Sequence, residues 1–156
     1  MSTVTESVDV HVPVHMAFNQ WTQVESFPHF MKGVKSVRQI DATHSHWVVN
    51  VAGTVREFDT EITEQHPNER IAWKSTSGKT EHAGVVTFHR LGDSDTRVTV
   101  QFDWEPEGLL ENIGSAIGAD SRQVKADALR FKTFIEERGS ETGAWRSEVQ
   151  TPDKRI

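Results

Sequence analysis

The sequence predicts an α+β domain in which a seven-stranded antiparallel sheet wraps around a long C-terminal helix, with two short helices after strand 1. Three observations lead to this prediction. The chain opens with an alternating strand, residues 34–104 read almost entirely as further strands, and residues 119–138 have the apolar spacing of a helix. The apolar positions of an antiparallel sheet gather on one face, which another element has to cover. The C-terminal helix is long and apolar enough to do so.

The first strand is predicted over Val4–Val12, where valines alternate with polar residues with one exception. A period of two is typical of a strand with one buried face. Pro13 ends this strand and suits the first position of a helix, because its missing N–H would be unpaired there. This helix runs to Trp21. A second short helix is predicted over Ser26–Lys32, with its serine as the N-cap.

Six more strands follow in the middle of the chain. They are Val34–Ile40, Ser45–Ala52, Val55–Gln65, Arg70–Thr76, His82–Leu91 and Thr96–Trp104. The links between them are short and rich in turn-forming residues, so successive strands should pair as antiparallel hairpins. In the fifth of these strands Val85 and Val86 are adjacent, and either face of that strand could point inward.

The long helix is predicted over Ala119–Arg138, and Gly139 ends it. At 100° per residue, four apolar positions lie within roughly 60° of one another around the helix axis and form one apolar face. These positions are Val124, Ala128, Phe131 and Ile135. A single helix cannot fill the concave side of so wide a sheet, so an internal cavity is expected.

The predicted domain covers residues 1–139. Residues 140–156 are polar and are expected to form a flexible tail, in which Trp145 offers one apolar side chain that can dock on the body. Between the last strand and the long helix, Gly108–Ile117 is a glycine-interrupted apolar stretch.

Composition excludes several classes of function. The 156 residues include 17 Lys and Arg against 23 Asp and Glu, a net charge of −6, which argues against a nucleic-acid partner. The absence of cysteine excludes disulfides, thiolate zinc sites and cysteine nucleophiles. No apolar run approaches the roughly 20 residues of a membrane-spanning helix, and no targeting peptide is visible. We therefore expect a cytoplasmic monomer or homodimer without an integral membrane segment.

Short segments spread over most of the chain carry a family likeness. They are the valine-rich first strand with Pro13, Trp21–Thr22, Phe27–Met31, Glu61–Gln65, Arg70–Ser75, Gly84–Phe88, Thr96–Val98 and Pro106–Gly108. Together with the element order, they resemble the SRPBCC superfamily of helix-grip proteins, which includes START lipid-transfer domains, the birch-pollen allergen family and polyketide cyclases. The chain looks most similar to bacterial proteins labelled polyketide cyclase/dehydrase. The resemblance implies the helix-grip fold and a hydrophobic ligand pocket.

Aromatic residues dominate the positions that should face this pocket. Three inward tryptophans suit a flat aromatic or polycyclic ligand, because aromatic walls combine contact area with stacking. The alternative is that they simply fill the core. The candidate ligand-binding residues are Trp47, Phe58, Thr60, Trp73, Phe88, Phe102, Trp104 and Phe131.

Two polar residues, Arg56 and His82, are also expected on the inner face. A buried arginine needs a partner, which could be Glu64 on the same strand face or an acidic group of a ligand. By analogy with cyclase relatives, Arg56 would stabilise an enolate during aldol closure while His82 moves the proton. The alternative is that both side chains are solvated near a sheet edge or the pocket mouth.

A metal site is not expected. His44 and His46 would lie on one side of a strand, but on its outer face and without a nearby carboxylate. The acidic residues Glu57, Asp59 and Glu61 should form a solvated outer face. No phosphate-binding loop is present, and no cofactor is expected.

The sequence thus favours binding of a hydrophobic small molecule (a lipid, a quinone or an aromatic, polyketide-like compound) in a cavity between the sheet and the C-terminal helix. The alternative is a polyketide cyclase or dehydratase type of enzyme that uses Arg56 and His82. An interaction protein that uses the outer face of the sheet ranks third.

Overall fold

The computed structural model describes residues 2–51, 53–78, 81–104 and 121–150. Its strands are β1 (Ser2–Val10), β2 (Val34–Gln39), β3 (His44–Val51), β4 (Thr54–His66), β5 (Arg70–Ser75), β6 (His82–Gly92) and β7 (Asp95–Trp104). Its helices are α1 (Val14–Trp21), the 3₁₀ helix η1 (Val24–His29) and α3 (Ser121–Arg138). The predicted seven-stranded sheet is confirmed: the strands form one sheet in the order β1-β7-β6-β5-β4-β3-β2, and every pairing is antiparallel.

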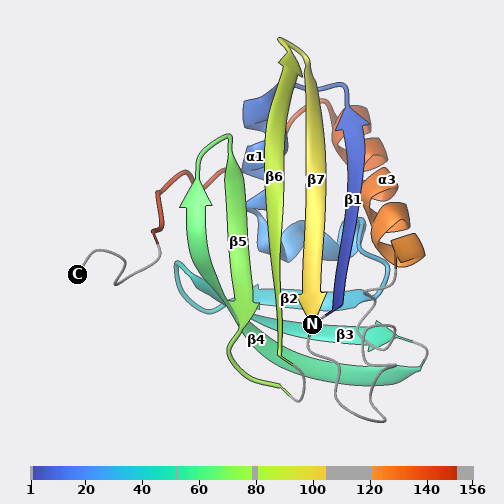
Figure 1. Cartoon of the computed structure of the whole chain (residues 1–156), viewed down its shortest axis with the longest axis vertical. Coiled ribbons are helices and arrows are strands. Elements are labelled where there is room, and N and C mark those ends of the chain that lie inside the picture. Colours follow the sequence, from blue (N-terminus) through green and yellow to red (C-terminus); the bar gives the residue numbers. More distant parts are fainter. Residues whose placement is uncertain (1, 52, 79–80, 105–120, 151–156) are drawn as a thin grey trace.

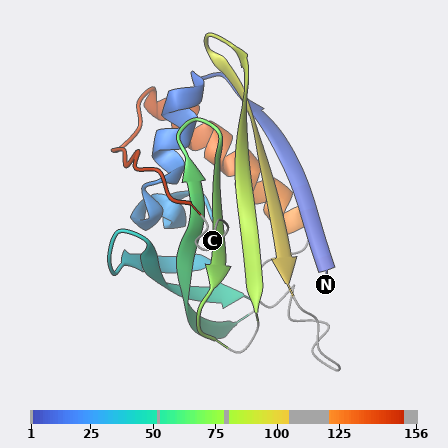
Figure 2. The ribbon, with the colours of Figure 1, turned by 60° about the vertical axis from the view of Figure 1, so that its left-hand side comes forward.

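The sheet curls around the helices. In Figures 1 and 2, β1, β7 and β6 follow the long axis of the molecule, β2, β3 and β4 cross its lower end, and α1, η1 and α3 all lie on one side. Shifts in strand register occur between Val34 and Ser36, between Ile62 and Glu64, and between Arg90 and Gly92. Such irregularities bend a strand and increase its twist. The result is a half-barrel whose concave side receives α3, as predicted.

The apolar face predicted for the C-terminal helix is confirmed in α3. Ala128, Phe131 and Ile135 are buried against the concave side of the sheet and the short helices. The ring of Phe131 lies 5.3 Å from that of Trp21 and 5.1 Å from that of Phe30, measured between centroids. This aromatic cluster joins α3 to α1 and to the residue that follows η1.

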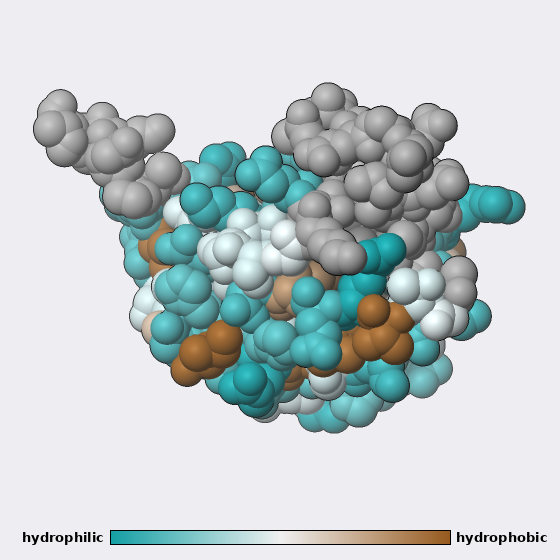
Figure 3. All heavy atoms as spheres, turned by 90° about the horizontal axis from the view of Figure 1, so that it is seen from below, coloured by the Kyte–Doolittle hydropathy of each residue, from teal (hydrophilic) through white to brown (hydrophobic). Residues whose placement is uncertain are grey.

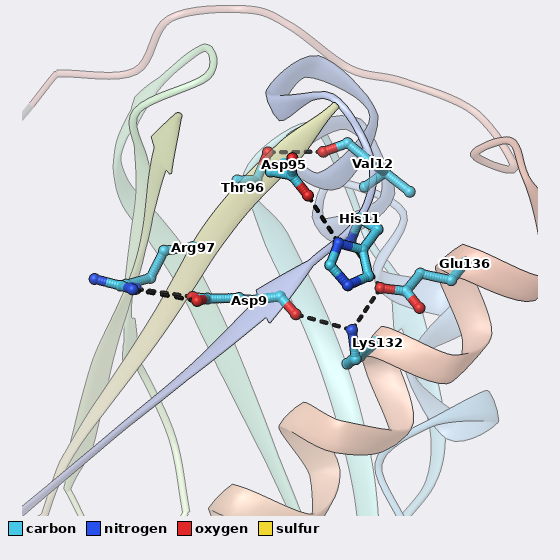
Figure 4. Close-up of polar contacts among 8 residues, drawn as sticks. All are labelled: Asp9, His11, Val12, Asp95, Thr96, Arg97, Lys132 and Glu136. Carbon is cyan, nitrogen blue, oxygen red and sulfur yellow. Dashed lines mark hydrogen bonds and ion pairs between the residues drawn. The ribbon is translucent and has the colours of Figure 1, made fainter. Parts of the chain in front are cut away.

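Polar contacts attach the last turns of α3 to the end of β1 (Figure 4). The Lys132 ammonium donates to the Asp9 carbonyl (3.1 Å) and pairs with Glu136 (2.7 Å). Glu136 also accepts the backbone N–H of His11 (2.7 Å). Asp9 in turn pairs with Arg97 of β7 (2.8 Å). These contacts anchor the C-terminal half of α3, while its first turns lie over the interior.

The second short helix differs from its prediction. It begins at Val24 rather than Ser26 and is a 3₁₀ helix with Pro28 inside it. Ser26 does not cap it: the serine hydroxyl donates to the Gln23 carbonyl (2.6 Å) and accepts from the Gln20 amide (2.9 Å). The apolar stretch predicted over Gly108–Ile117 lies outside the described residues.

Residues 140–150 lie along the body of the domain. Gln20, which is fully buried, accepts the backbone N–H of Thr142 (2.9 Å). Gln65, also buried, donates to the carbonyls of Trp145 (3.1 Å) and Ser147 (2.9 Å). Its backbone forms an antiparallel bridge with Val149. The domain boundary at residue 139 and a flexible tail beyond it stay predictions.

The surface offers apolar groups only at separate places among the described residues. Exposed large apolar side chains are Ile40, Val55, Leu91 and Leu129, which belong to different parts of the fold. On the lower end of the molecule, Figure 3 shows brown apolar groups separated by hydrophilic ones. None of the described helices is long and apolar enough to cross a membrane. The concave interior is therefore where the structure gathers apolar surface.

Candidate ligand-binding cavity

A cavity of about 150 Å³ lies between the sheet and the helices. Six strands, β2 to β7, contribute to one wall, and the other wall comes from α1, η1, the residues after η1 and the first turns of α3. Its sheet wall includes Trp47, Phe58, Thr60, Trp73, His82 and Phe102. Its helical wall includes Trp21, Phe27, Met31, Val124, Asp127 and Ala128.

Strand alternation and register create the aromatic wall. Residues two apart on a strand share a face, so Phe58 and Thr60 of β4 both reach the cavity. Trp47 of β3 is the register partner of Phe58, and their rings stack with centroids 5.8 Å apart. The Trp47 indole N–H donates to the buried hydroxyl of Thr60 (2.9 Å). This polar group of the wall is thus satisfied within the protein.

Trp73 enters the wall because its neighbour is a glycine. Trp73 of β5 is the register partner of Gly84 of β6. A Cβ atom at position 84 would lie 2.3 Å from the indole ring of Trp73, which is far inside van der Waals contact. Gly84 therefore provides the space in which this indole lies, a role that sequence reasoning missed.

His82 occupies the centre of an aromatic row. Its ring packs edge-on against Phe58, with centroids 4.6 Å apart, and stacks on Phe102 at 5.5 Å. The residue is buried, and neither ring nitrogen has a hydrogen-bond partner among the described residues. Burial lowers the pKa of His82 to about 4, so the ring is neutral at pH 7. It then has one N–H donor and one nitrogen acceptor to offer.

Arg56 lies beside the cavity wall, not in it. It has the same strand phase as Phe58 and is the register partner of Val49, which lines the cavity. Its Nε is buried and without a hydrogen-bond partner among the described residues. The pairing with Glu64 that the sequence suggested is wrong. Arg56 and Glu64 are eight residues apart on β4, a rise of roughly 26 Å, so their side chains cannot meet. Glu64 pairs with Arg70 (2.7 Å) instead.

The helical wall contributes a polar cluster around Asp127 of α3. This carboxylate accepts from Arg130 (2.6 Å), from the Gln123 amide (3.1 Å) and from the backbone N–H of Lys32 (3.2 Å). Burial raises the pKa of Asp127, and the hydrogen bond from Arg130 opposes this effect. The cluster closes the gap between α3 and the residues that follow η1.

Two of the remaining candidate residues, Phe88 and Phe131, are not among the residues that line the cavity. Phe88 packs edge-on against Phe18 in the core, with centroids 5.5 Å apart. Phe131 belongs to the aromatic cluster under α3. The side chain of Trp104 lies outside the described part of the chain.

The sequence profile of the family described as polyketide cyclase/dehydrase and lipid transport matches residues 10–133. The chain belongs to this family.

Relatives of the chain are found at both the sequence and the structure level. The "uncharacterized 17.2 kDa protein in melC2-rnhH intergenic region" of Streptomyces lincolnensis is 55% identical over 149 residues, 96% of this chain and 99% of the relative. A START superfamily protein from Mycobacterium smegmatis superposes with a TM-score of 0.70 at 16% identity, over 87% of this chain and 98% of that one. The Zhui aromatase/cyclase from Streptomyces sp. R1128 gives a TM-score of 0.70 at 15% identity, over 92% and 99%. Both structures share the fold of this polyketide cyclase/dehydrase family member.

The helical wall holds polar lining residues that sequence reasoning did not single out for a site, among them Trp21 and Asp127. Trp21 lines the cavity with an indole nitrogen that is buried and unpaired among the described residues. Asp127 lies beside the apolar stripe of α3 and does not belong to it, so the helical period does not identify this residue. A signal was available: Asp127 directly precedes the buried Ala128 on that stripe, at a position where a carboxylate approaches the interior.

The outer face of the sheet corrects one further expectation. Carboxylates do lie near His46, because β3 and β4 pair so that Asp59 is its register partner. Asp59 (2.7 Å) and Glu57 (2.9 Å) each contact one ring nitrogen of His46. These hydrogen bonds raise the pKa of His46. The described residues contain no group of three or more side chains arranged to hold a metal ion.

Proposed function

We propose that this family member binds an apolar, ring-containing small molecule in the cavity between the sheet and α3. The residues proposed to contact it are Trp47, Phe58, Thr60, Trp73 and Phe102, together with His82. The observation that carries the proposal is the cavity itself. Apolar and aromatic side chains from six strands and three helices surround it, where an ordinary core would be closely packed.

The unpaired imidazole supports a binding role. A buried polar group left without a hydrogen bond costs about 1–3 kcal/mol. A polar atom of a ligand would remove this cost for His82 and so gain affinity and orientation. A cytoplasmic location and a monomeric or homodimeric state remain predictions that accompany the proposal.

Native mass spectrometry of freshly purified protein, followed by organic extraction, tests the proposal. We expect a discrete extra mass that extraction releases as a small organic compound. Val100→Phe narrows the cavity and should abolish this extra mass, whereas Val85→Phe, on the opposite face of the sheet, should retain it. An extra mass held equally by both variants would place the compound elsewhere and contradict the proposal.

The second candidate function is an enzyme of the polyketide cyclase or dehydratase type. The buried and unpaired nitrogens of both Arg56 and His82 favour it. In this proposal neutral His82 removes a proton from the carbon between two ketones, and the Arg56 guanidinium stabilises the enolate. The enolate carbon bonds to a second carbonyl carbon of the same chain, and the resulting alkoxide takes the proton back from His82.

Single substitutions separate the two candidates. Arg56→Ala and His82→Ala should each abolish cyclisation of a linear poly-β-ketone while leaving it bound, if the protein is such an enzyme. If neither variant changes the handling of this compound, the two side chains have no catalytic role.

A further inference from the structure

The volume of the cavity limits the size of its ligand. At about 150 Å³ it is smaller than the roughly 300–1,000 Å³ of common ligand sites. A protein cavity of about 150 Å³ lined by apolar side chains takes up a molecule such as benzene. The cavity therefore has room for about one aromatic ring, and a fused polycyclic compound would require the walls to move apart.

The aromatic composition of the sheet wall favours a ring-containing ligand. Trp47 stacks with Phe58, the Phe58 and His82 rings meet edge-on, and His82 stacks with Phe102. Flat rings present extended faces and edges, against which another ring gains stacking or edge-on contacts that a flexible alkyl chain does not make. The wall is thus better matched to an aromatic ring than to an acyl chain.

The hydrogen-bonding chemistry of His82 indicates a hydroxyl group on that ring. Trp47 and Thr60 already satisfy each other, whereas both ring nitrogens of His82 are buried and lack a partner among the described residues. Because its imidazole is neutral, it does not attract an anion by charge, and Asp127 on the opposite wall adds no positive charge. The charged Arg56 is not among the residues that line the cavity. A hydroxyl can donate to one ring nitrogen or accept from the other, so it suits either tautomer.

We propose that the ligand is a compact, neutral hydroxyaromatic compound with one ring, which lies against Trp47, Phe58 and Phe102 and forms a hydrogen bond to His82 through its hydroxyl. This inference rests on the proposed binding function. It replaces the wider range of lipids, quinones and polycyclic compounds that the sequence allowed.

Calorimetric titration of the full chain with four compounds tests the inference. They are 4-methylphenol, toluene, 1,8-dihydroxyanthraquinone and palmitate. The first two share size and differ by the hydroxyl, so the ratio of their dissociation constants isolates its contribution. We expect His82→Phe to reduce the preference for 4-methylphenol about tenfold, the effect of losing one hydrogen bond to a buried group. His89→Phe changes an exposed histidine of the same strand and should preserve the wild-type ratio.

Each outcome separates the inference from the function on which it rests. If the wild type and His82→Phe show the same ratio, the role of His82 is overturned. If the anthraquinone or palmitate binds and 4-methylphenol does not, the size class is overturned while the binding function stands. If none of the four compounds binds, both fail. The nitrogen resonances of the His82 ring provide a measurement without any substitution: they should shift when 4-methylphenol is added to the wild type and stay unchanged with toluene.

Discussion

Replacing His82 by phenylalanine should change how the stability of the protein depends on pH. His82 is buried between two phenylalanine rings, and its pKa falls from an ordinary 6.5 to about 4. At pH 5 the unfolded chain has a protonated imidazole at this position, whereas the folded protein keeps it neutral. The unfolded state therefore binds more protons, and the free energy of unfolding decreases as the pH falls below 6.5.

The size of this effect follows from the two pKa values. One pKa unit corresponds to about 1.4 kcal/mol of stability. At pH 5 the folded protein has already lost most of the stability that corresponds to the shift of the His82 pKa. We expect the wild type to lose about 2 kcal/mol of stability relative to His82→Phe between about pH 7.5 and about pH 5. Phenylalanine cannot be protonated, and its ring keeps the aromatic contacts, so the variant lacks this loss.

Urea unfolding followed by tryptophan fluorescence at a series of pH values measures the difference. All other titrating groups are common to both proteins, so subtracting the two curves leaves the His82 contribution. His89→Phe is the matched control and should follow the wild type because its histidine is exposed. A difference between wild type and His82→Phe that is the same at every pH would refute the reasoning. It would mean that the folded imidazole is not shielded from protons.

Three further predictions concern packing. Phe131→Asp should cost more than about 4 kcal/mol or prevent folding, since it buries a charge under α3, whereas Leu129→Asp on the exposed side of the helix should leave the melting temperature nearly unchanged. Gly84→Ala should destabilise the protein by about 1–3 kcal/mol in urea unfolding, because the added methyl group collides with an indole ring; full stability would refute that contact. Gln65→Ala should speed tryptic cleavage after Arg146, because it removes two hydrogen bonds that hold residues 145–147; an unchanged cleavage rate would show that the segment is held by other contacts.

Local patterns in the sequence were sufficient to predict the architecture. The alternating valines of the first strand and the apolar stripe of the long helix each repeat with the period of their own element. Such periods report which residues share a face, and turn residues report where successive strands reverse. The seven antiparallel strands, the two short helices and the helix on the concave side follow from these signals. The same signals identified Trp47, Phe58 and Trp73 as inward residues.

Tertiary structure decided the features that depend on neighbouring strands. The two adjacent valines of β6 left open which face of this strand points inward. The pairing of β6 with β7 decides it: Gly84 is the register partner of Phe102, and His82 points toward the cavity. The register shift after Ile62 changes the face of β4 on which Glu64 lies, and Glu64 pairs with Arg70. In both cases the direction of a side chain depends on hydrogen bonds to another strand, which no local period contains.

Tertiary structure alone also decided the size of the cavity and the course of residues 140–150. A cavity is the small volume left when many side chains from distant segments have packed, so its 150 Å³ cannot be summed from local patterns. Residues 140–150 have no apolar period to mark them as part of the fold. They lie along the domain because buried Gln20 and Gln65, more than seventy residues away in the chain, need hydrogen-bond partners that the sheet does not supply. The sequence thus determined which faces are apolar, and the folded chain determined what those faces enclose.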